Sequence, residues 1–256
     1  MLNPFQLGRV VRSRKTLPAI EHRAGSERAY LVALRQLVRT AYQAIRVTTS
    51  EPLITITVDY TGLTRRLARA LGLALPQAIE TVQAIIQGEG EYHTRRWRAA
   101  TNAIATIDLS AVIKQEDIAE EFGAILQRNA SLITNLSQDI TNRVSQSVSS
   151  AVLNGESAGT LSEALREQFG IVGRRADLIA RDQIASAVSD LNMIRQKQAG
   201  VLSYKWSTSS DERVRASHAA LDGKEFNWGD DGPDHGHHPG QAVNCRCVAL
   251  GVVEPF

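Results

Sequence analysis

The only two cysteines of the chain, Cys245 and Cys247, stand two residues apart near its C-terminal end. On an extended strand alternate residues face the same side, so both sulfurs would point one way and Arg246 the other. Thiolate sulfur and imidazole nitrogen are common zinc ligands in proteins. With His218 as the third ligand, the pattern predicts a zinc site whose fourth ligand is His235, His237 or His238, and we take His238 as the candidate.

Two other interpretations use the same residues. Cysteine is often simply a buried small residue, and His218 would then be a structural histidine hydrogen-bonded within a turn. A metal-dependent or cysteine hydrolase centred on His218, Cys245 and Cys247 is the catalytic alternative, with Cys245 as nucleophile and His218 as base. The base would then be oriented by Asn244 or Asp211. The histidine-rich loop is also open to a simpler interpretation, as a solvated segment that binds metal only weakly.

The overall charge of +2 conceals a strongly basic N-terminal region. Residues 1–46 carry nine Lys and Arg against two Glu, and the remainder carries 20 basic against 25 acidic residues. A basic segment suits an acidic partner such as DNA or an acidic protein surface, although a solvated charged face is the commoner outcome. The candidate contact residues are Arg9, Arg12, Arg14, Lys15, Arg28, Arg35 and Arg39.

Composition and periodicity predict a mainly α protein, a helical body with long amphipathic helices plus a small C-terminal α+β module. No apolar run approaches the roughly 20 residues that a membrane-spanning helix needs, and two cysteines cannot form a disulfide scaffold at this length. We expect three parts: a basic arm at 1–25, a mostly helical body at 26–200 with a short strand near 53–60, and the C-terminal module at 201–256.

Apolar residues at helical spacing predict the elements of the body. Ser26 is expected to cap the first helix, Pro76 to open one, and Gly88 and Gly90 to end it. Thr160, with Glu163 three residues later, is expected to cap another. Trp97 lies among arginines and is expected either to stack on bases or to pack in the core. The predicted helices span 26–45, 63–71, 76–87, 91–106, 116–153, 160–169 and 174–198.

The pattern changes after Gly200. Residues 201–207 alternate, with Tyr204 and Trp206 on one face, which predicts a strand. A helix is expected at 213–221, a loop at 227–240 that is rich in Gly, Asp and His, and a returning strand at 244–252 that carries both cysteines.

Three runs of this module form a recognisable motif. They are Asp211-Glu-Arg213-Val-Arg215-Ala-Ser-His218-Ala-Ala-Leu-Asp-Gly223, then His238-Pro-Gly, then Asn244-Cys245-Arg246-Cys247. The motif resembles the C-terminal module of the phage Mu F-like minor head protein family, also called the head morphogenesis family. The resemblance covers about residues 154–250, and a weaker helical match reaches back to about residue 115.

The resemblance implies a minor head (capsid) protein that acts in head morphogenesis at or near the portal vertex, with a role in DNA packaging or delivery. The implied partners are the portal protein, the major capsid protein and packaged DNA, with several copies of the chain around the portal. Its place would be the virion, and the host cytoplasm during assembly. The motif residues would then specify a fold and a docking surface rather than an enzyme, with Arg246 paired to Asp211 or Asp222.

Overall fold

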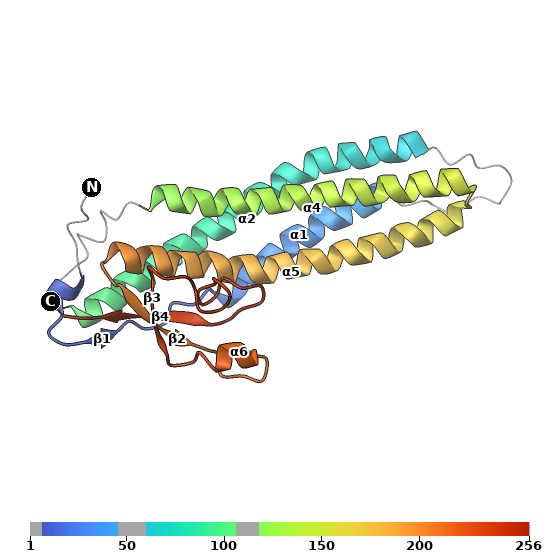
Figure 1. Cartoon of the computed structure of the whole chain (residues 1–256). Coiled ribbons are helices and arrows are strands. Elements are labelled where there is room, and N and C mark those ends of the chain that lie inside the picture. Colours follow the sequence, from blue (N-terminus) through green and yellow to red (C-terminus); the bar gives the residue numbers. More distant parts are fainter. Residues whose placement is uncertain (1–6, 46–59, 106–117, 256) are drawn as a thin grey trace. The chain divides into compact units, whose positions relative to one another are not determined.

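The computed structural model describes residues 7–45, 60–105 and 118–255 (Figure 1). Most of these residues lie in four long helices: α1 (Ala24–Ile45), α2 (Tyr60–Ile104), α4 (Ala119–Asn154) and α5 (Ala158–Gln198). The shorter elements are the 3-10 helix η1 (Leu7–Val10), the helix α6 (Ala216–Ala219) and the strands β1 (Lys15–Thr16), β2 (Ser203–Ser207), β3 (Glu225–Asn227) and β4 (Val248–Val253). The predicted class, mainly α with a small C-terminal α+β module, is confirmed.

The chain divides into two compact units, each assembled from separate stretches of sequence. The first unit comprises Met1–Ser26, Ile86–Leu126 and Arg181–Phe256, and the second comprises Glu27–Ile85 and Gln127–Ala180. These units cut across the segments expected from sequence, because the N-terminal residues and the C-terminal module fall in one unit. The strand expected near 53–60 lies outside the described residues. None of the helices that the structure describes is long and apolar enough to pass through a membrane.

The second unit is built on helical stripes of buried apolar residues. In α4, Ile133, Leu136, Ile140 and Val144 are at most 1% exposed and recur every three or four residues, as predicted for an amphipathic helix. One buried hydrogen bond joins α1 to α4: the Tyr30 hydroxyl donates to Asn129 Oδ1 at 2.9 Å. The helices predicted at 26–45 and 116–153 are therefore confirmed, with ends within three residues of those expected.

The breaks expected within residues 63–106 are wrong, because α2 runs unbroken through Pro76, Gly88 and Gly90. The two glycines make room for neighbours instead of ending the helix. A Cβ at Gly88 would lie 3.0 Å from the Arg23 guanidinium, and one at Gly90 would lie 2.9 Å from the Phe122 ring. Close packing therefore explains both glycines, and burial along α2 outweighs the hydrogen bond that a proline removes.

The helices expected at 160–169 and 174–198 are also one helix, α5, because the buried stripe from Leu161 through Phe169 to Ala176 is continuous. Its cap is Ser157 and not Thr160, since Ser157 Oγ accepts the backbone N–H of Thr160 at 3.1 Å. The cap expected for α1 is wrong as well: α1 begins at Ala24, and the Ser26 hydroxyl hydrogen-bonds the buried Glu89 carboxylate.

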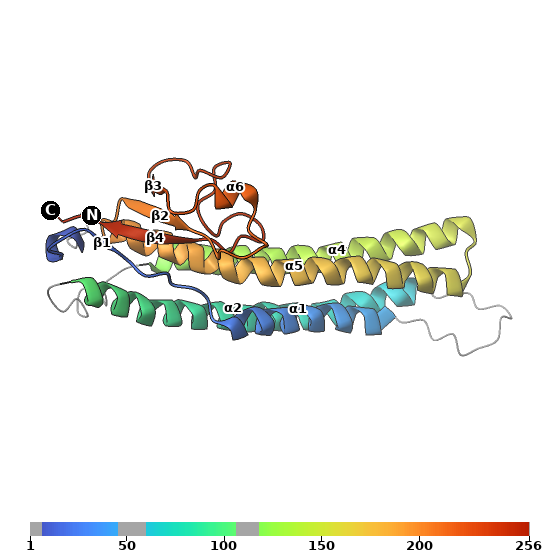
Figure 2. The same ribbon diagram turned by 90° about the horizontal axis from the view of Figure 1, so that it is seen from below.

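The sheet of the first unit is antiparallel, with the strand order β1-β4-β2-β3. On β2, Tyr204 and Trp206 are buried and lie opposite the small residues Gly251 and Ala249 of β4, which leave room for the rings. The sheet lies against the C-terminal part of α5 (Figure 2). There Gln196 links the layers, donating to the Ala249 carbonyl at 3.1 Å and accepting from Trp228 Nε1 at 3.0 Å.

The N-terminal segment, expected to form a basic arm, packs into the core of the first unit over its described residues. Leu7, Leu17 and Ile20 are buried in one cluster with Trp97 and Val253. Lys15–Thr16 adds the edge strand β1 to β4. Trp97, for which sequence left base stacking or core packing open, is thus a core residue at 1% exposure.

Candidate functional site

His218 is carried by a helix much shorter than the one expected at 213–221. The helix α6 covers only Ala216–Ala219, since the residues before it form a turn in which the Arg213 N–H donates to Asp211 Oδ1 at 3.0 Å. The following turn ends with Gly223, whose φ of +73° favours glycine. The ring of His218 is 3% exposed and lies edge-on to Trp206, with the ring centroids 5.4 Å apart.

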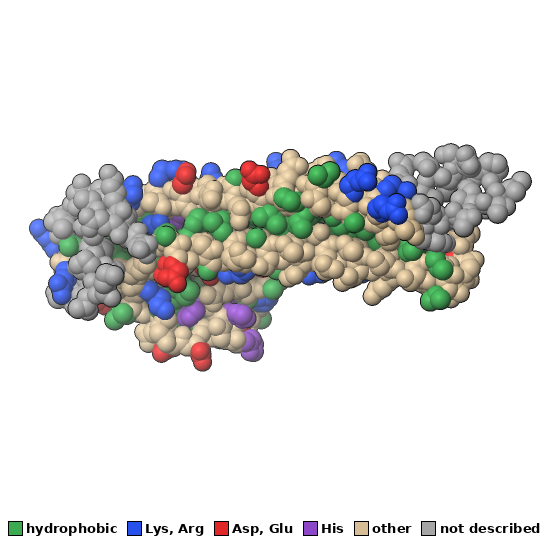
Figure 3. Space-filling view, turned by 90° about the horizontal axis from the view of Figure 1, so that it is seen from above, with side chains coloured by type: hydrophobic (Ala, Val, Ile, Leu, Met, Phe, Trp, Pro, Cys, Tyr) green, Lys and Arg blue, Asp and Glu red, His purple; other side chains and the backbone are tan. Residues whose placement is uncertain are grey.

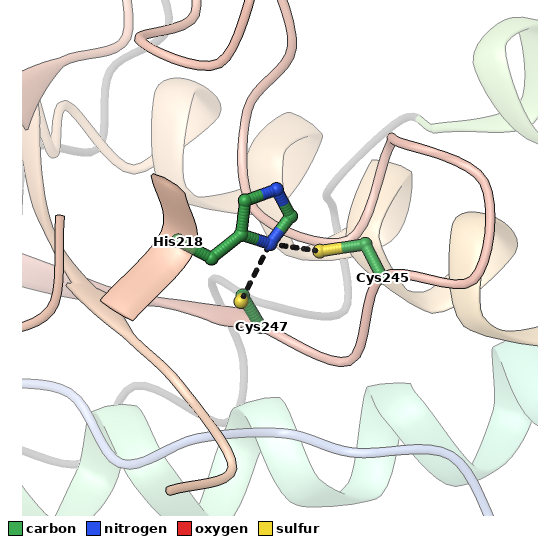
Figure 4. Close-up of side chains that lie close together, drawn as sticks. All are labelled: His218, Cys245 and Cys247. Atoms are coloured by element: carbon green, nitrogen blue, oxygen red, sulfur yellow. Dashed lines mark hydrogen bonds between the residues drawn. The ribbon is translucent and has the colours of Figure 1, made fainter. Parts of the chain in front are cut away.

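The two cysteines precede β4 and do not lie on it. They follow a turn at Asn244, which takes a positive φ of 58° and donates its backbone N–H to Asp182 Oδ1 at 3.0 Å. Both sulfurs nevertheless face the same way, as expected. His218 Nδ1 is 3.6 Å from Cys245 Sγ and 3.4 Å from Cys247 Sγ (Figure 4). We call His218, Cys245 and Cys247 the cysteine–histidine cluster.

Asp234 completes this arrangement, and sequence reasoning missed it. Its Oδ2 lies 2.9 Å from His218 Nε2, and the residue is 9% exposed. Asp234 is held by a tight loop that is closed by bridges from Gly232 to Gly236 and from Asp234 to His237. A Cβ at Gly232 would lie 2.1 Å from the His237 carbonyl carbon, so the loop needs glycine there. The signal available in sequence was a loop rich in Gly and Asp beside a candidate ligand histidine.

The contact with Asp234 determines which ring nitrogen of His218 carries the proton. A carboxylate accepts hydrogen bonds, so Nε2 carries the proton and the Nδ1 lone pair faces the two sulfurs. A hydrogen bond from the Cys247 thiol lowers the pKa of Cys245 to about 6, opposed by burial and aided by the Gly240 N–H at 3.4 Å. The same pairing and burial raise the pKa of Cys247. The geometry thus favours a thiolate at Cys245.

The candidate fourth ligand, His238, lies outside this cluster. Its Nδ1 hydrogen-bonds the Tyr204 hydroxyl at 2.8 Å. Among the described residues, the group whose ligand atoms all lie within 4.8 Å of one another consists of His218, Cys245 and Cys247. His235 and His237 are exposed, and histidines gather over this part of the molecule in the space-filling view (Figure 3).

The remaining motif residues hold the backbone around the cluster. Arg246 forms a two-point ion pair with Asp211, at 2.6 and 2.7 Å, while Asp222 accepts the Thr208 N–H. Arg215 donates to the Val243 carbonyl at 2.5 Å. Asn244 and Asp211 were the residues expected to orient His218 as a catalytic base. The carboxylate that contacts His218 is instead that of Asp234, and Asp211 pairs with Arg246.

A second sequence pattern with catalytic spacing, Gly-Glu-Ser-Ala-Gly at 155–159, was also missed and is structural. A nucleophile elbow of this type needs a strand before the serine and a helix after it. Here α4 precedes Ser157, which is exposed and caps α5. This serine is accordingly a helix cap.

The basic candidates of the N-terminal region differ in their surroundings. Arg14 pairs with Glu225 at 2.5 Å and Glu254 at 2.6 Å, and Arg35 forms a two-point contact with Asp177 at 2.9 and 2.8 Å. The other candidates are exposed: Arg9, Arg12, Lys15, Arg28 and Arg39.

Comparison with known proteins agrees with the motif of the C-terminal part. Residues 142–250 match the family model described as phage Mu protein F like protein, which confirms the resemblance for this segment. An uncharacterized protein of Haemophilus influenzae is 34% identical over 149 residues, covering 58% of this chain and 33% of the relative. The minor head protein GP7 of Bacillus phage SPP1 is 23% identical over 131 residues, covering 45% and 42%.

The chain therefore spans less than half the length of either relative. No solved structure shows significant similarity to it.

Proposed function

We propose that this chain is a phage minor head protein that acts in head morphogenesis at or near the portal vertex, with a role in DNA packaging or delivery. The observation that carries the proposal is the match of residues 142–250 to the Mu F-like family, joined by the similarity to a minor head protein of phage SPP1. Its partners are then the portal protein or the major capsid protein. Several copies surround the portal after assembly in the host cytoplasm.

The contacts of the motif support a docking module rather than a catalyst. The pairing of Arg246 with Asp211 and the Arg215 bond to the Val243 carbonyl join the α6 turn to the cysteine segment. These bonds hold the surface of the module in one conformation, and they engage both Arg246 and Arg215 in contacts within the protein.

The exposed basic residues of the N-terminal region are the proposed contacts for packaged DNA or an acidic portal surface. Arg9, Arg12 and Lys15 are exposed on the first unit, whereas Arg14 and Arg35 already pair with carboxylates. Phosphate contacts release counterions, so DNA binding should weaken steeply as salt rises. Filter binding over a salt series tests this role, and affinity that does not change with salt counts against it.

The head role is tested in the phage that encodes the chain. Deleting the gene should abolish infectious titre, and a plasmid copy should restore it. Imaging of particles that carry a tagged chain should show density at the portal vertex. Particles that lack the chain, or tagged density spread over the capsid, would contradict the proposal.

A cysteine hydrolase is the second candidate, because Asp234, His218 and Cys245 are linked in the order that orients a base beside a thiol. Two features count against it: Cys245 is 4% exposed, and Cys247 lies even closer to the same imidazole nitrogen. The variant Cys245→Ala separates the two candidate functions. A hydrolase would lose its nucleophile and phage titre would fall, whereas a head protein without hydrolase activity should keep its titre. That readout assumes folded protein, which circular dichroism checks.

A further inference from the structure

The cysteine–histidine cluster has the dimensions of a metal site. Zinc lies about 2.3 Å from a thiolate sulfur and about 2.0 Å from an imidazole nitrogen, so tetrahedral angles place N and S about 3.6 Å apart. The observed Nδ1–Sγ distances are 3.6 and 3.4 Å. Both N–S distances thus match the edges of one zinc tetrahedron, and all three ligand atoms lie within 4.8 Å of one another.

The surroundings orient these ligands as a metal requires. Asp234 accepts a hydrogen bond from Nε2–H of His218 and leaves the Nδ1 lone pair directed at the sulfurs, an arrangement that recurs around zinc-bound histidines. The Gly240 N–H donates to Cys245 Sγ, which stabilises negative charge on sulfur. Two thiolates and a neutral imidazole cancel the charge of a divalent cation, which suits a site where all three residues are at most 6% exposed.

We propose that His218 Nδ1, Cys245 Sγ and Cys247 Sγ bind one Zn²⁺ ion, with Asp234 as the positioning residue behind the histidine. Binding forms two Zn–S bonds and one Zn–N bond, and any proton that either sulfur still carries is released to solvent. All three ligand residues line a cavity of about 110 Å³, together with Ser209 and Asn244. This cavity supplies a water molecule as the fourth ligand, in the place that His238 was expected to fill.

The zinc site does not depend on the head role, because it rests on the geometry of the cluster alone. It also differs from a buried thiol pair in a measurable way. Tetrahedral coordination by two sulfurs gives a cobalt-substituted protein intense visible bands and a sulfur-to-metal charge-transfer absorption, whereas thiols without metal give neither.

The test uses the full-length chain, purified in reductant, treated with a chelator and then mixed with Zn²⁺. We expect about one zinc ion per chain, at least tenfold weaker binding in Cys247→Ser and His218→Gln, and a loss of about 10- to 100-fold in Asp234→Asn. His237→Gln is the matched control: His237 is exposed in the loop that carries Asp234, and its replacement should leave zinc affinity unchanged.

Zinc protection of Cys245 and Cys247 from alkylation in the wild-type chain needs no variant, and it decides the matter if a variant fails to fold. The proposal is overturned if the wild-type chain binds no zinc, if added zinc leaves alkylation unchanged, or if His237→Gln and not Cys247→Ser removes the metal.

Discussion

Apolar stripes hold the second unit together, with residues such as Leu136, Ile140 and Val144 almost wholly buried every fourth position. In the C-terminal segment, residues 201–255, a few aromatic rings cover a short sheet, and side-chain contacts hold the loops. His218, Asp234 and Arg246 each tie a loop or turn to another part of the segment, and Gln196 of α5 bonds to Ala249 and Trp228. The helical unit should therefore tolerate exposed polar changes and fail when its core is emptied, whereas the C-terminal segment should respond to changes at single buried polar positions or at single glycines.

The largest effect is expected in the helical core. Leu136→Ala should lower the free energy of unfolding by about 3 kcal/mol, because it leaves a cavity at a side chain that is 0% exposed. Thermal melting followed by far-ultraviolet circular dichroism measures the change. Leu73→Ala is the matched control: Leu73 is 76% exposed and the same substitution should cost little. Equal losses in the two variants would remove apolar burial as the basis of this unit.

Next comes the loop that carries Asp234. Gly232→Ala should cost about 2 kcal/mol or more, because its Cβ would overlap the His237 carbonyl carbon and the loop backbone must shift. Gly229→Ala meets nothing within 4 Å and should be close to neutral. Chemical denaturation followed by tryptophan fluorescence compares them, and a neutral Gly232→Ala would show that the loop is loose.

A third prediction concerns acid. Burial, with the charge of Arg195, lowers the pKa of His93 to about 3, whereas an unfolded histidine titrates near 6.5. Below pH 6.5 the unfolded state binds the extra proton, so His93 reduces stability as pH falls. The reduction should reach about 2 kcal/mol at pH 5.

His93→Gln removes this titration. Its unfolding free energy should therefore fall less between pH 7 and pH 5 than that of the wild-type chain, by about the same 2 kcal/mol. Parallel losses in the two proteins would show that His93 takes up a proton in the folded state.

The smallest effect is expected at the exposed ion pair of Asp211 with Arg246. The Arg246 guanidinium and the Arg213 N–H lower the pKa of Asp211, yet water and salt screen the pair. Asp211→Asn should lower the melting temperature slightly, and added salt should narrow the difference. Glu212→Gln, at the neighbouring exposed position, serves as control. A large loss in Asp211→Asn would mean that the turn depends on this pair.

The sequence predicted the helices and strands that have a periodic pattern of apolar residues. It did not predict features that depend on contacts between residues far apart in the chain. The spacing of apolar residues predicted α1, α4 and β2. The two-residue spacing of Cys245 and Cys247 correctly predicted that both sulfurs face one way, although the two residues precede β4 and do not lie on it. The continuation of α2 through Gly90 was missed, because the reason for a glycine at this position is its close packing against the Phe122 ring. Asp234 was missed because its loop has no periodicity and is shaped by the Gly232 contact.

The contrast between the two regions is tested most directly by hydrogen–deuterium exchange of the Cys247→Ser variant against the wild-type chain. Exchange should accelerate at Ser203–Ser207 and Val248–Val253, which the cysteine–histidine cluster adjoins, and remain unchanged at Ile133, Leu136 and Val144 in the helical unit. Unchanged protection of the two strands, or acceleration spread equally over both units, would contradict the account.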